Sequence, residues 1–154
     1  ASGASDTVTL AQESEYIQSY VSLMCLRRDL DVCLKVEISP ELLTCKILKF
    51  TMQPFVENSI LHGAVEGKIT IYISAEVTDA GILEIRIQDN GIGFDAQDTQ
   101  EAHKDSRRFH SIGINNVSER IKMYYGDSYG VQIQSRCGEG TLVILTQPLI
   151  ESNE

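Results

Sequence analysis

The spacing of apolar residues changes from one segment of the chain to the next and predicts alternating helices and strands. Apolar residues recur every three or four positions over residues 9–28, as on the buried face of a helix. They alternate with polar residues over 68–78, which is typical of a strand with one buried face. The same criteria give this order: helix 9–28, strand 32–38, helix 48–62, strands 68–78 and 82–88, helix 114–125, and strands 131–135 and 141–147.

Residues at the helix ends support some of these boundaries and leave two points open. Thr9 and Gln12 fit the T-x-x-Q capping box at the start of the first helix, and Gly126 fits the end of the last. Pro54 means that the second helix either begins near residue 51, with the proline in its first turn, or kinks at the proline. The apolar stripe of the first helix could pack on its own domain or on a partner subunit, and the local pattern does not decide.

The order of the elements and the chain length predict one domain, a two-layer α/β sandwich. Strands joined by tight turns favour a largely antiparallel or mixed sheet, and helices would cover one face. A chain of 154 residues corresponds to about one domain. Leu, Ile, Val and Phe make up about 29% of the residues, above the roughly 20% below which chains tend to stay disordered. The chain can therefore form a hydrophobic core.

The net charge of −9 argues against several classes of partner. Neutralising nucleic-acid phosphates needs an excess of Lys and Arg, and an acidic surface is repelled by anionic lipid headgroups. No apolar run reaches the roughly 18 residues that a membrane span needs, and no signal peptide is recognisable. The four cysteines form no C-x-x-C pair, which favours free thiols in a reduced cytosolic protein over zinc binding or a redox couple.

Residues 95–111 differ from the rest of the chain because they have no apolar periodicity and many charges. We expect a loop, and loops of this length in a compact domain are usually functional or mobile. Three of its basic residues, Lys104, Arg107 and Arg108, lie shortly before Gly113 and a predicted helix start. Helix N-termini and basic side chains both attract anions, so this segment could close over phosphates. A disordered charged loop is the alternative.

Asp89 continues the apolar face of the strand before it, which predicts that its carboxylate points towards the core. That face consists of Leu83, Ile85 and Ile87. A buried carboxylate needs hydrogen-bond donors, or its pKa rises. The sequence NGIG (90–93) follows directly, and its two glycines allow a tight turn and a close backbone approach. An ordinary Asp-Asn-Gly turn explains the same residues structurally.

Two polar residues share one stripe of the second helix. Asn58 and His62 are four positions apart and therefore lie on the same side of the helix. This stripe flanks the core positions Met52, Val56 and Ile60. An amide and an imidazole placed in this way could contact a metal ion or a phosphate. The structural alternative is a solvated helix face with a histidine near the C-terminus, where the helix dipole favours it.

In this order, these motifs resemble the catalytic ATP-binding domain of sensor histidine kinases, within the GHKL superfamily that also includes gyrase, Hsp90 and MutL. The stretch QPFVENSILHG (53–63) looks like the N box, and DNGIG (89–93) looks like the first glycine box. SIGINNV (111–117) looks like the second glycine box, with the ATP lid before it. GEGT (138–141), by itself only a hairpin turn, looks like the last glycine motif. The residues of these motifs most resemble those of YesM/LytS-like kinases. The resemblance extends over roughly residues 8–148.

The resemblance implies a Bergerat-type fold, with a mixed sheet, helices on one face and an ATP lid, and it implies ATP and Mg²⁺ as ligands. Asp89 would accept the adenine amino group, with Thr141 nearby through water. Asn58 would hold Mg²⁺, His62 would approach the phosphates, and Glu57 is grouped with these two as catalytic. The residues implied to bring backbone or positive charge close to the nucleotide are Gly91, Gly93 and Gly113, and Lys104, Arg107 and Arg108.

The sequence departs from the family pattern at two positions. Ser111 stands where these kinases usually have the first glycine of the second glycine box, which could stiffen the hinge of the lid or weaken a phosphate contact. Pro54 stands where gyrase, Hsp90 and MutL have a general-base glutamate. Proline cannot take a proton, so activation of water is unsupported here. This suits a kinase that keeps ATP for a protein acceptor.

The resemblance further implies a kinase that transfers the ATP γ-phosphoryl group to a histidine outside this chain, in two-component signal transduction. None of the three histidines of the chain fits as the acceptor. We therefore expect residues 1–28 to be a linker helix from an upstream dimerisation and phosphoacceptor domain, and residues 29–154 to be the ATP-binding catalytic domain. Both parts would be cytoplasmic.

The expected parent protein is a homodimer anchored in the bacterial inner membrane, with a response regulator as indirect partner and no nucleic-acid partner. One alternative is an anti-sigma-factor-type serine kinase, which differs in its acceptor and has nothing missing upstream. The other is a non-enzymatic nucleotide-binding or interaction domain, for which Ser111 is the only support in the sequence.

Overall fold

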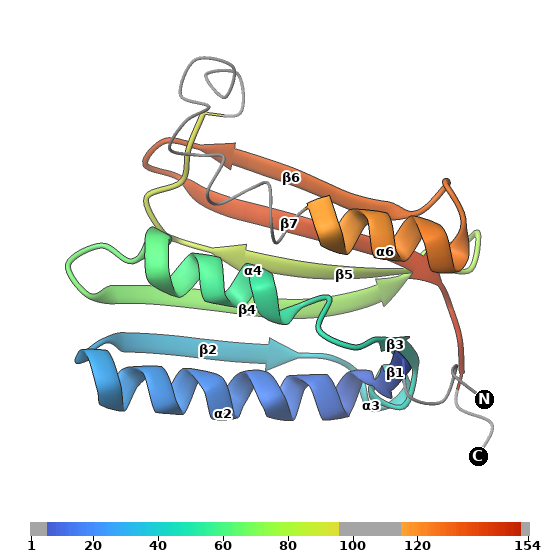
Figure 1. Ribbon diagram of the computed structural model, residues 1–154, viewed down its shortest axis with the longest axis horizontal. Coiled ribbons are helices and arrows are strands. Elements are labelled where there is room, and N and C mark those ends of the chain that lie inside the picture. The colour runs from blue at the N-terminus through green and yellow to red at the C-terminus, as the bar shows by residue number, and fades with distance from the viewer. Residues whose placement is uncertain (1–5, 96–114, 152–154) are drawn as a thin grey trace.

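A five-stranded mixed sheet carries the main helices of the protein on one face (Figure 1). The computed structural model describes residues 6–95 and 115–151. The strand order is β2-β4-β5-β7-β6, with β2 parallel to β4 and all other neighbours antiparallel. The strands are β2 (Asp31–Glu37), β4 (Lys68–Val77), β5 (Ile82–Asp89), β6 (Gly130–Arg136) and β7 (Gly140–Pro148).

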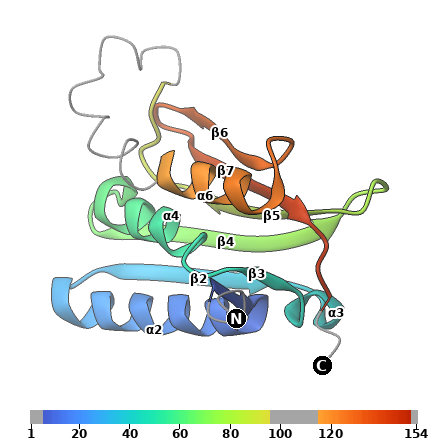
Figure 2. The ribbon, with the colours of Figure 1, turned by 45° about the vertical axis from the view of Figure 1, so that its right-hand side comes forward.

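The helices form the second layer, so the predicted two-layer fold with a mixed sheet is confirmed. Helix α2 (Leu10–Arg28) lies along β2, α4 (Gln53–Asn58) lies over β4, and α6 (Asn115–Tyr125) packs on β6 and β7 (Figure 2). None of the helices within the described residues is long and apolar enough to cross a membrane.

The core lies between the helices and the sheet, and it follows the predicted alternation. Ile73 pairs with Ile87, and Ile71 pairs with Asp89, so the core face of β4 and β5 is continuous as far as the carboxylate. Burying one such side chain stabilises the fold by about 1.5–3 kcal/mol. The core residues of these two strands that are at most 2% exposed are Ile71, Ile73, Leu83, Ile85 and Ile87.

Helix α2 is part of this core. Thr9 caps its N-terminus, and both bonds of the predicted capping box are present: Gln12 N–H donates to Thr9 Oγ1 at 3.1 Å, and Thr9 N–H donates to Gln12 Oε1 at 2.9 Å. Ile17 and Val21 are buried in the same cluster as the sheet residues. Of the two alternatives left open by the sequence, the apolar stripe therefore packs on its own domain.

The predicted helix 48–62 is shorter than expected and is divided in two. Helix α4 begins at Gln53, with Pro54 in its first turn, so the kinked alternative is wrong. A π-helical turn, η1 (Ser59–Gly63), follows directly after Asn58. The core stripe is confirmed, because Met52, Val56 and Ile60 are at most 2% exposed.

Helix α6 docks on the sheet with one side. Val117 and Ile121 are buried and Tyr125 packs against the core, whereas Tyr124 is 47% exposed. Positions 117, 121 and 125 are four apart, which keeps them on one side of a helix. Gly126 ends the helix with φ of 115°, and its N–H bonds to Lys122 O.

Three short elements were missing from the prediction. They are β1 (Thr7–Thr9), α3 (Pro40–Leu43) and β3 (Lys46–Leu48). Strands β1 and β3 pair antiparallel and form a separate two-stranded sheet. Elements of three or four residues are too short to show a hydrophobic period, so the sequence pattern could not reveal them.

Candidate functional site

Asp89, the last residue of β5, is the centre of the candidate site. Its side chain lies on the core face and the residue is 8% exposed, as its strand parity predicts. Ser59 Oγ donates to Asp89 Oδ2 at 2.6 Å. Asp89 Oδ1 accepts from the N–H groups of Gly91 at 2.9 Å and of Thr141 at 3.2 Å. These three donors stabilise a carboxylate that burial would otherwise destabilise.

The local sequence explains why the carboxylate meets these donors. Pairing of β5 with β7 places Thr141 opposite Asp89, so the start of β7 comes to the end of β5. Ser59 reaches the carboxylate from η1, which packs against β4. A carboxylate offers about four acceptor positions, and three donors use three of them. Asp89 can therefore accept one more hydrogen bond from a ligand.

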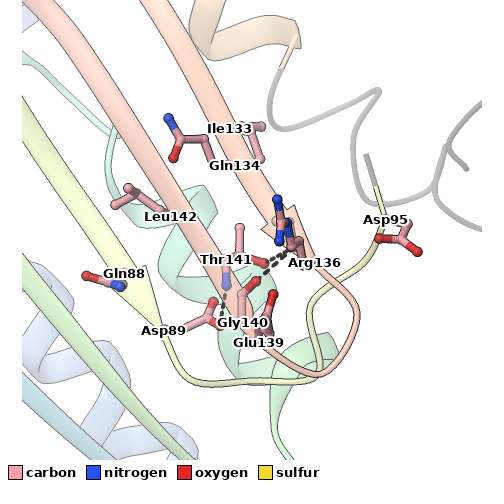
Figure 3. Close-up of a pocket in the computed structure, with 11 residues that line it drawn as sticks. Gln88, Asp89, Asp95, Ile133, Gln134, Arg136, Glu139, Gly140, Thr141 and Leu142 are labelled. Atoms are coloured by element: carbon pink, nitrogen blue, oxygen red, sulfur yellow. Dashed lines mark hydrogen bonds between the residues drawn. The ribbon is translucent and has the colours of Figure 1, made fainter. Parts of the chain in front are cut away.

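A cleft of about 850 Å³ opens beside Asp89 at the ends of β5, β6 and β7 (Figure 3). Ser135 and Thr141 also line it, and their hydroxyl oxygens are 2.8 Å apart. This volume lies in the range of small-molecule sites, roughly 300–1,000 Å³. The acceptor position of Asp89 and the two hydroxyl groups provide the polar contacts that such a site needs to orient a ligand.

The glycines of the loop after β5 allow the backbone to pack against the chain itself. A Cβ atom at Gly91 would lie 2.5 Å from Gly63 O, and Gly93 has φ of +61° with the Arg136 backbone against it. Ile92 N–H also bonds to Gly63 O at 2.9 Å. The close approach that is visible here is therefore to η1 and to the end of β6. The approach of these glycines to a nucleotide stays a prediction.

Asn58 and His62 do not lie on one regular helix. Asn58 is the last residue of α4 and His62 lies in η1, so the 3.6-residue period on which their alignment was predicted ends between them. Partial burial lowers the pKa of the otherwise exposed His62 ring below its ordinary value. The imidazole is therefore mostly neutral at pH 7 and would act there through hydrogen bonds rather than as a cation.

Glu57 lies on the helix that contacts α2. Its Oε1 accepts from Gln53 Nε2 at 3.2 Å. Desolvation raises the pKa of Tyr20 on α2, and the negative charge of Glu57 adds to this increase. The structure thus brings Glu57 close to the first helix, whereas its second neighbour along the chain, Ser59, faces Asp89.

The donors for a metal ion are limited among the described residues. No group of three His, Cys, Asp or Glu side chains in residues 6–95 and 115–151 is arranged to hold a metal ion. Mg²⁺ usually keeps several waters and takes one or two protein oxygens together with substrate phosphates. The half-buried Asn58 amide fits this pattern as a single protein ligand, so the residues present are compatible with Mg²⁺ carried by a nucleotide.

Several predicted site residues cannot be placed. Gly113 and Ser111, and the basic residues Lys104, Arg107 and Arg108, lie outside the described residues.

Ser59 was missing from the predicted site residues, although the sequence contained a signal for it. Ser59 is three positions after the core residue Val56, so it lies on the core side of the helix. A polar side chain buried there needs a hydrogen-bond partner.

Comparison with known protein families identifies the family of this chain. Residues 46–151 match the family model described as "Histidine kinase-, DNA gyrase B-, and HSP90-like ATPase". This match covers more than half of the chain, so the protein belongs to that family, and the resemblance predicted from its motifs is confirmed. Membership of this ATPase family implies a nucleotide ligand.

The relatives are sensor kinases. The chain is 33% identical over 151 residues to an uncharacterised sensor-like histidine kinase of Staphylococcus epidermidis. This alignment covers 96% of this chain and 29% of that protein. It is 29% identical over 144 residues to the sensor histidine kinase YesM of Bacillus subtilis, covering 93% of this chain and 24% of YesM. The chain thus spans less than a third of the length of these relatives.

Solved structures show the same fold. The mycobacterial sensor histidine kinase MprB superposes with a TM-score of 0.65 at 16% identity, over 96% of this chain and 99% of that one. The histidine kinase domain from the Erythrobacter litoralis EL346 blue-light activated kinase gives a TM-score of 0.55 at 14% identity, over 92% of this chain and 62% of that one. At these identities, the likeness concerns the fold alone.

Proposed function

We propose that this chain is the ATP-binding catalytic domain of a sensor histidine kinase and supplies the ATP γ-phosphoryl group to a histidine elsewhere in the parent protein. The observation that carries the proposal is Asp89, a buried carboxylate that has three internal donors, keeps one acceptor position and lines a cleft. The family match and the sensor kinase relatives support the same function. They do not favour a serine kinase or a non-enzymatic domain.

In this proposal, Asp89 selects the base of the nucleotide. Its remaining acceptor position receives the amino group of adenine, and Thr141 takes part through a bridging water. Guanine carries a carbonyl oxygen at the corresponding position, which would face the carboxylate with no proton between them. A site with a buried acceptor rejects a ligand that lacks the matching donor strongly, so ATP is bound in preference to GTP.

The proposed phosphate end of the site consists of residues from the N box and from the segment that the structure does not describe. Asn58 holds Mg²⁺, which neutralises phosphate charge when bound. His62 donates a hydrogen bond to a phosphate, and Glu57 is the third residue proposed as catalytic. The residues proposed from the sequence to bring charge or backbone to the phosphates are Lys104, Arg107 and Arg108, and Gly91, Gly93 and Gly113.

Pro54 supports transfer to a protein rather than hydrolysis. It lies in the first turn of α4, where it offers neither a proton-accepting side chain nor a backbone N–H. In the proposed protein, the phosphoacceptor histidine is in an upstream dimerisation domain. Residues 1–28 connect to that domain, while their helix α2 also packs in the core of this one. The full-length protein is proposed to be a homodimer anchored in the bacterial inner membrane that passes its phosphoryl group to a response regulator.

Two measurements test this function. Calorimetry with a non-hydrolysable ATP analogue and the matching GTP analogue should show binding of the first and at least about a hundredfold weaker binding of the second. Radiolabelled ATP, mixed with this chain and the separately produced upstream domain, should label that domain with an acid-labile, base-stable phosphate. Acid-stable label on serine would favour the serine kinase, and binding without transfer would favour a non-enzymatic domain.

A further inference from the structure

The backbone just before α4 is held by a carboxylate from α2. Phe50 N–H donates to Glu13 Oε1 at 2.7 Å, and Met52 N–H donates to Glu13 Oε2 at 2.9 Å. Glu13 is 1% exposed and lies 37 and 39 positions earlier in the chain than these two partners. One buried side chain therefore joins the first helix to the start of the helix that carries Asn58.

This carboxylate has no counter-cation among the described residues. Its partners within residues 6–95 and 115–151 are backbone N–H groups, and the ion pairs there belong to Arg86. Desolvation by burial raises the pKa of Glu13, while the N–H groups of Met52 and Phe50 act in the opposite direction. The cost of burying this carboxylate is therefore offset by backbone N–H groups at the start of α4 and not by a cation, which ties the carboxylate to the position of that backbone.

The segment that Glu13 holds has an unusual backbone. Phe50 has φ of 60°, the left-handed region that residues with a side chain rarely adopt. The N–H bond to Glu13 and a ring contact with Tyr16, one turn further along α2, both help to keep Phe50 in this conformation; the two ring centroids are 6.3 Å apart. The turn at residues 49–52 is therefore shaped by α2 rather than by its own conformational preference.

Helix α6 also bonds to the same turn. Arg120 Nη2 donates to Lys49 O at 2.7 Å. Residues 49–52 thus connect α2, α4 and α6 through backbone atoms, and we call them the N-box junction. Helix α4 has only six residues before η1 begins, so a shift at the junction moves Asn58 with it.

We propose that Glu13 is a positioning residue for nucleotide binding, which sets the place of Asn58 by fixing the N-box junction, and that Arg120 acts on the same junction from α6. This inference rests on the proposed function, because Asn58 is the residue proposed to hold Mg²⁺. It makes α2 a structural link through which a movement of the first helix changes the phosphate end of the site.

The test compares Glu13→Gln, Arg120→Met and the control Ser14→Ala. Glutamine has the shape of glutamate, but its Nε2 cannot accept from a junction N–H, so one buried donor loses its partner. Arg120 is exposed, so its variant removes the bond to Lys49 without disturbing the core. Ser14 is 5% exposed, and among the described residues its side chain bonds only to Leu10 O of α2, at 2.8 Å. Ser14→Ala therefore changes the same helix turn without touching the junction.

Three measurements are made on each protein under conditions where urea titration shows it folded. They are the Kd of an ATP analogue with Mg²⁺, the NMR position of the Asn58 side-chain amide without ligand, and the free energy of unfolding. We expect Glu13→Gln to weaken binding by about tenfold or more, Arg120→Met by about threefold, and Ser14→Ala by less than about twofold. The Asn58 amide signal should move in the first two variants and stay in place in the control.

The outcomes separate this inference from the proposed function. If the unmodified chain binds no ATP analogue, the proposed function fails, and the Asn58 amide signal still tests the positioning role. If the unmodified chain binds, and both junction variants bind equally well with an unmoved Asn58 signal, the positioning role is overturned. An equal loss in Ser14→Ala overturns it as well. Should Glu13→Gln fail to fold, Arg120→Met decides.

Discussion

At the residue scale, Asp89 shows how one carboxylate can be both buried and available. Its donors come from η1, from the loop after β5 and from the start of β7, so three segments distant in sequence meet at one side chain. Hydrogen bonds to an ionised group are stronger than bonds between neutral groups. The charge is thus stabilised by the fold before any ligand is present, and a ligand need only use the remaining acceptor position.

We predict that Asp89→Asn weakens ATP binding by about 10- to 150-fold, because a hydrogen bond to a charged acceptor contributes roughly 1.5–3 kcal/mol. The amide has the same shape, but its NH₂ group cannot accept from the adenine amino group. Calorimetry with the ATP analogue measures the loss, and circular dichroism shows whether the variant is folded. The control is Glu84→Gln, the same change on the opposite face of β5. Unchanged affinity in Asp89→Asn would remove adenine recognition from this residue.

At the element scale, the short α4 and the π-helical turn after it place three consecutive residues in different surroundings. Glu57 accepts a hydrogen bond from Gln53, Asn58 ends the helix, and Ser59 bonds to Asp89. Successive helical residues point about 100° apart, so one turn of helix can serve both the base end and the phosphate end of a ligand. This arrangement leads to a separate prediction for Asn58.

We predict that Asn58→Ala lowers the affinity for Mg²⁺-ATP by about tenfold and the affinity for metal-free ATP by less than about threefold, since its amide oxygen would bind the metal. The comparison is between calorimetric titrations with Mg²⁺ and with a chelator. Gln53→Ala, another polar residue of α4, is the control for a general effect on the helix. Equal losses in both titrations would contradict the metal role.

The docking of α6 leads to a prediction about alkaline pH. Desolvation by burial raises the pKa of Tyr125 from 10.0 to about 12, and the nearby Tyr124 adds to this increase. A hydrogen bond with Gln147 lowers the pKa but does not cancel the increase. The folded state therefore holds the phenol proton more tightly than the unfolded state does. The stability that depends on this proton is complete below pH 10 and is lost as the pH rises through about 12.

We expect Tyr125→Phe to lose less unfolding free energy than the unmodified chain between pH 9 and pH 12, because phenylalanine has no proton to lose. Urea unfolding at a series of pH values gives this difference. Tyr124→Phe is the matched control, since Tyr124 is its neighbour on α6 and is 47% exposed. If both variants follow the same pH profile as the unmodified chain, the docking of Tyr125 does not contribute to the alkaline transition.

At the scale of the whole molecule, the acidic charge of the chain opposes the binding of an anionic nucleotide. The net charge is −9, and ATP adds several more negative charges. Coulomb repulsion at long range is weakened by salt, whereas local cations in contact with phosphates are affected less. Binding therefore depends on a few well-placed positive groups and not on the average charge of the surface.

We predict that replacing Lys104, Arg107 and Arg108 together by alanine weakens binding of the ATP analogue by at least about tenfold, through the loss of charge-assisted bonds to phosphate. The control variant replaces Arg27, Lys35 and Lys46, which changes the net charge equally at other places. Calorimetry at two salt concentrations compares them. A similar small loss in both variants would mean that only the overall charge matters and that the basic segment makes no phosphate contact.

Local patterns in the sequence were sufficient to predict most elements and one part of the site. The hydrophobic period defined α2, β2, β4, β5, β6 and β7, because each is long enough to bury a regular face. The parity of β5 predicted that Asp89 points inward, since alternation is a property of the strand itself. The glycine and N-box motifs were sufficient to identify the family, since they can be read without knowing which segments meet.

Only the tertiary structure decided which side chains meet across long distances in the sequence. The Ser59 and Thr141 bonds to Asp89 depend on how η1 and β7 pack against the end of β5, and no local period contains that information. Glu13 lies on the apolar stripe of α2, yet its two partners 37 and 39 residues later appear only when α2 is packed beside α4. Periodicity determines the face on which a residue lies, whereas the packing of elements determines its partner.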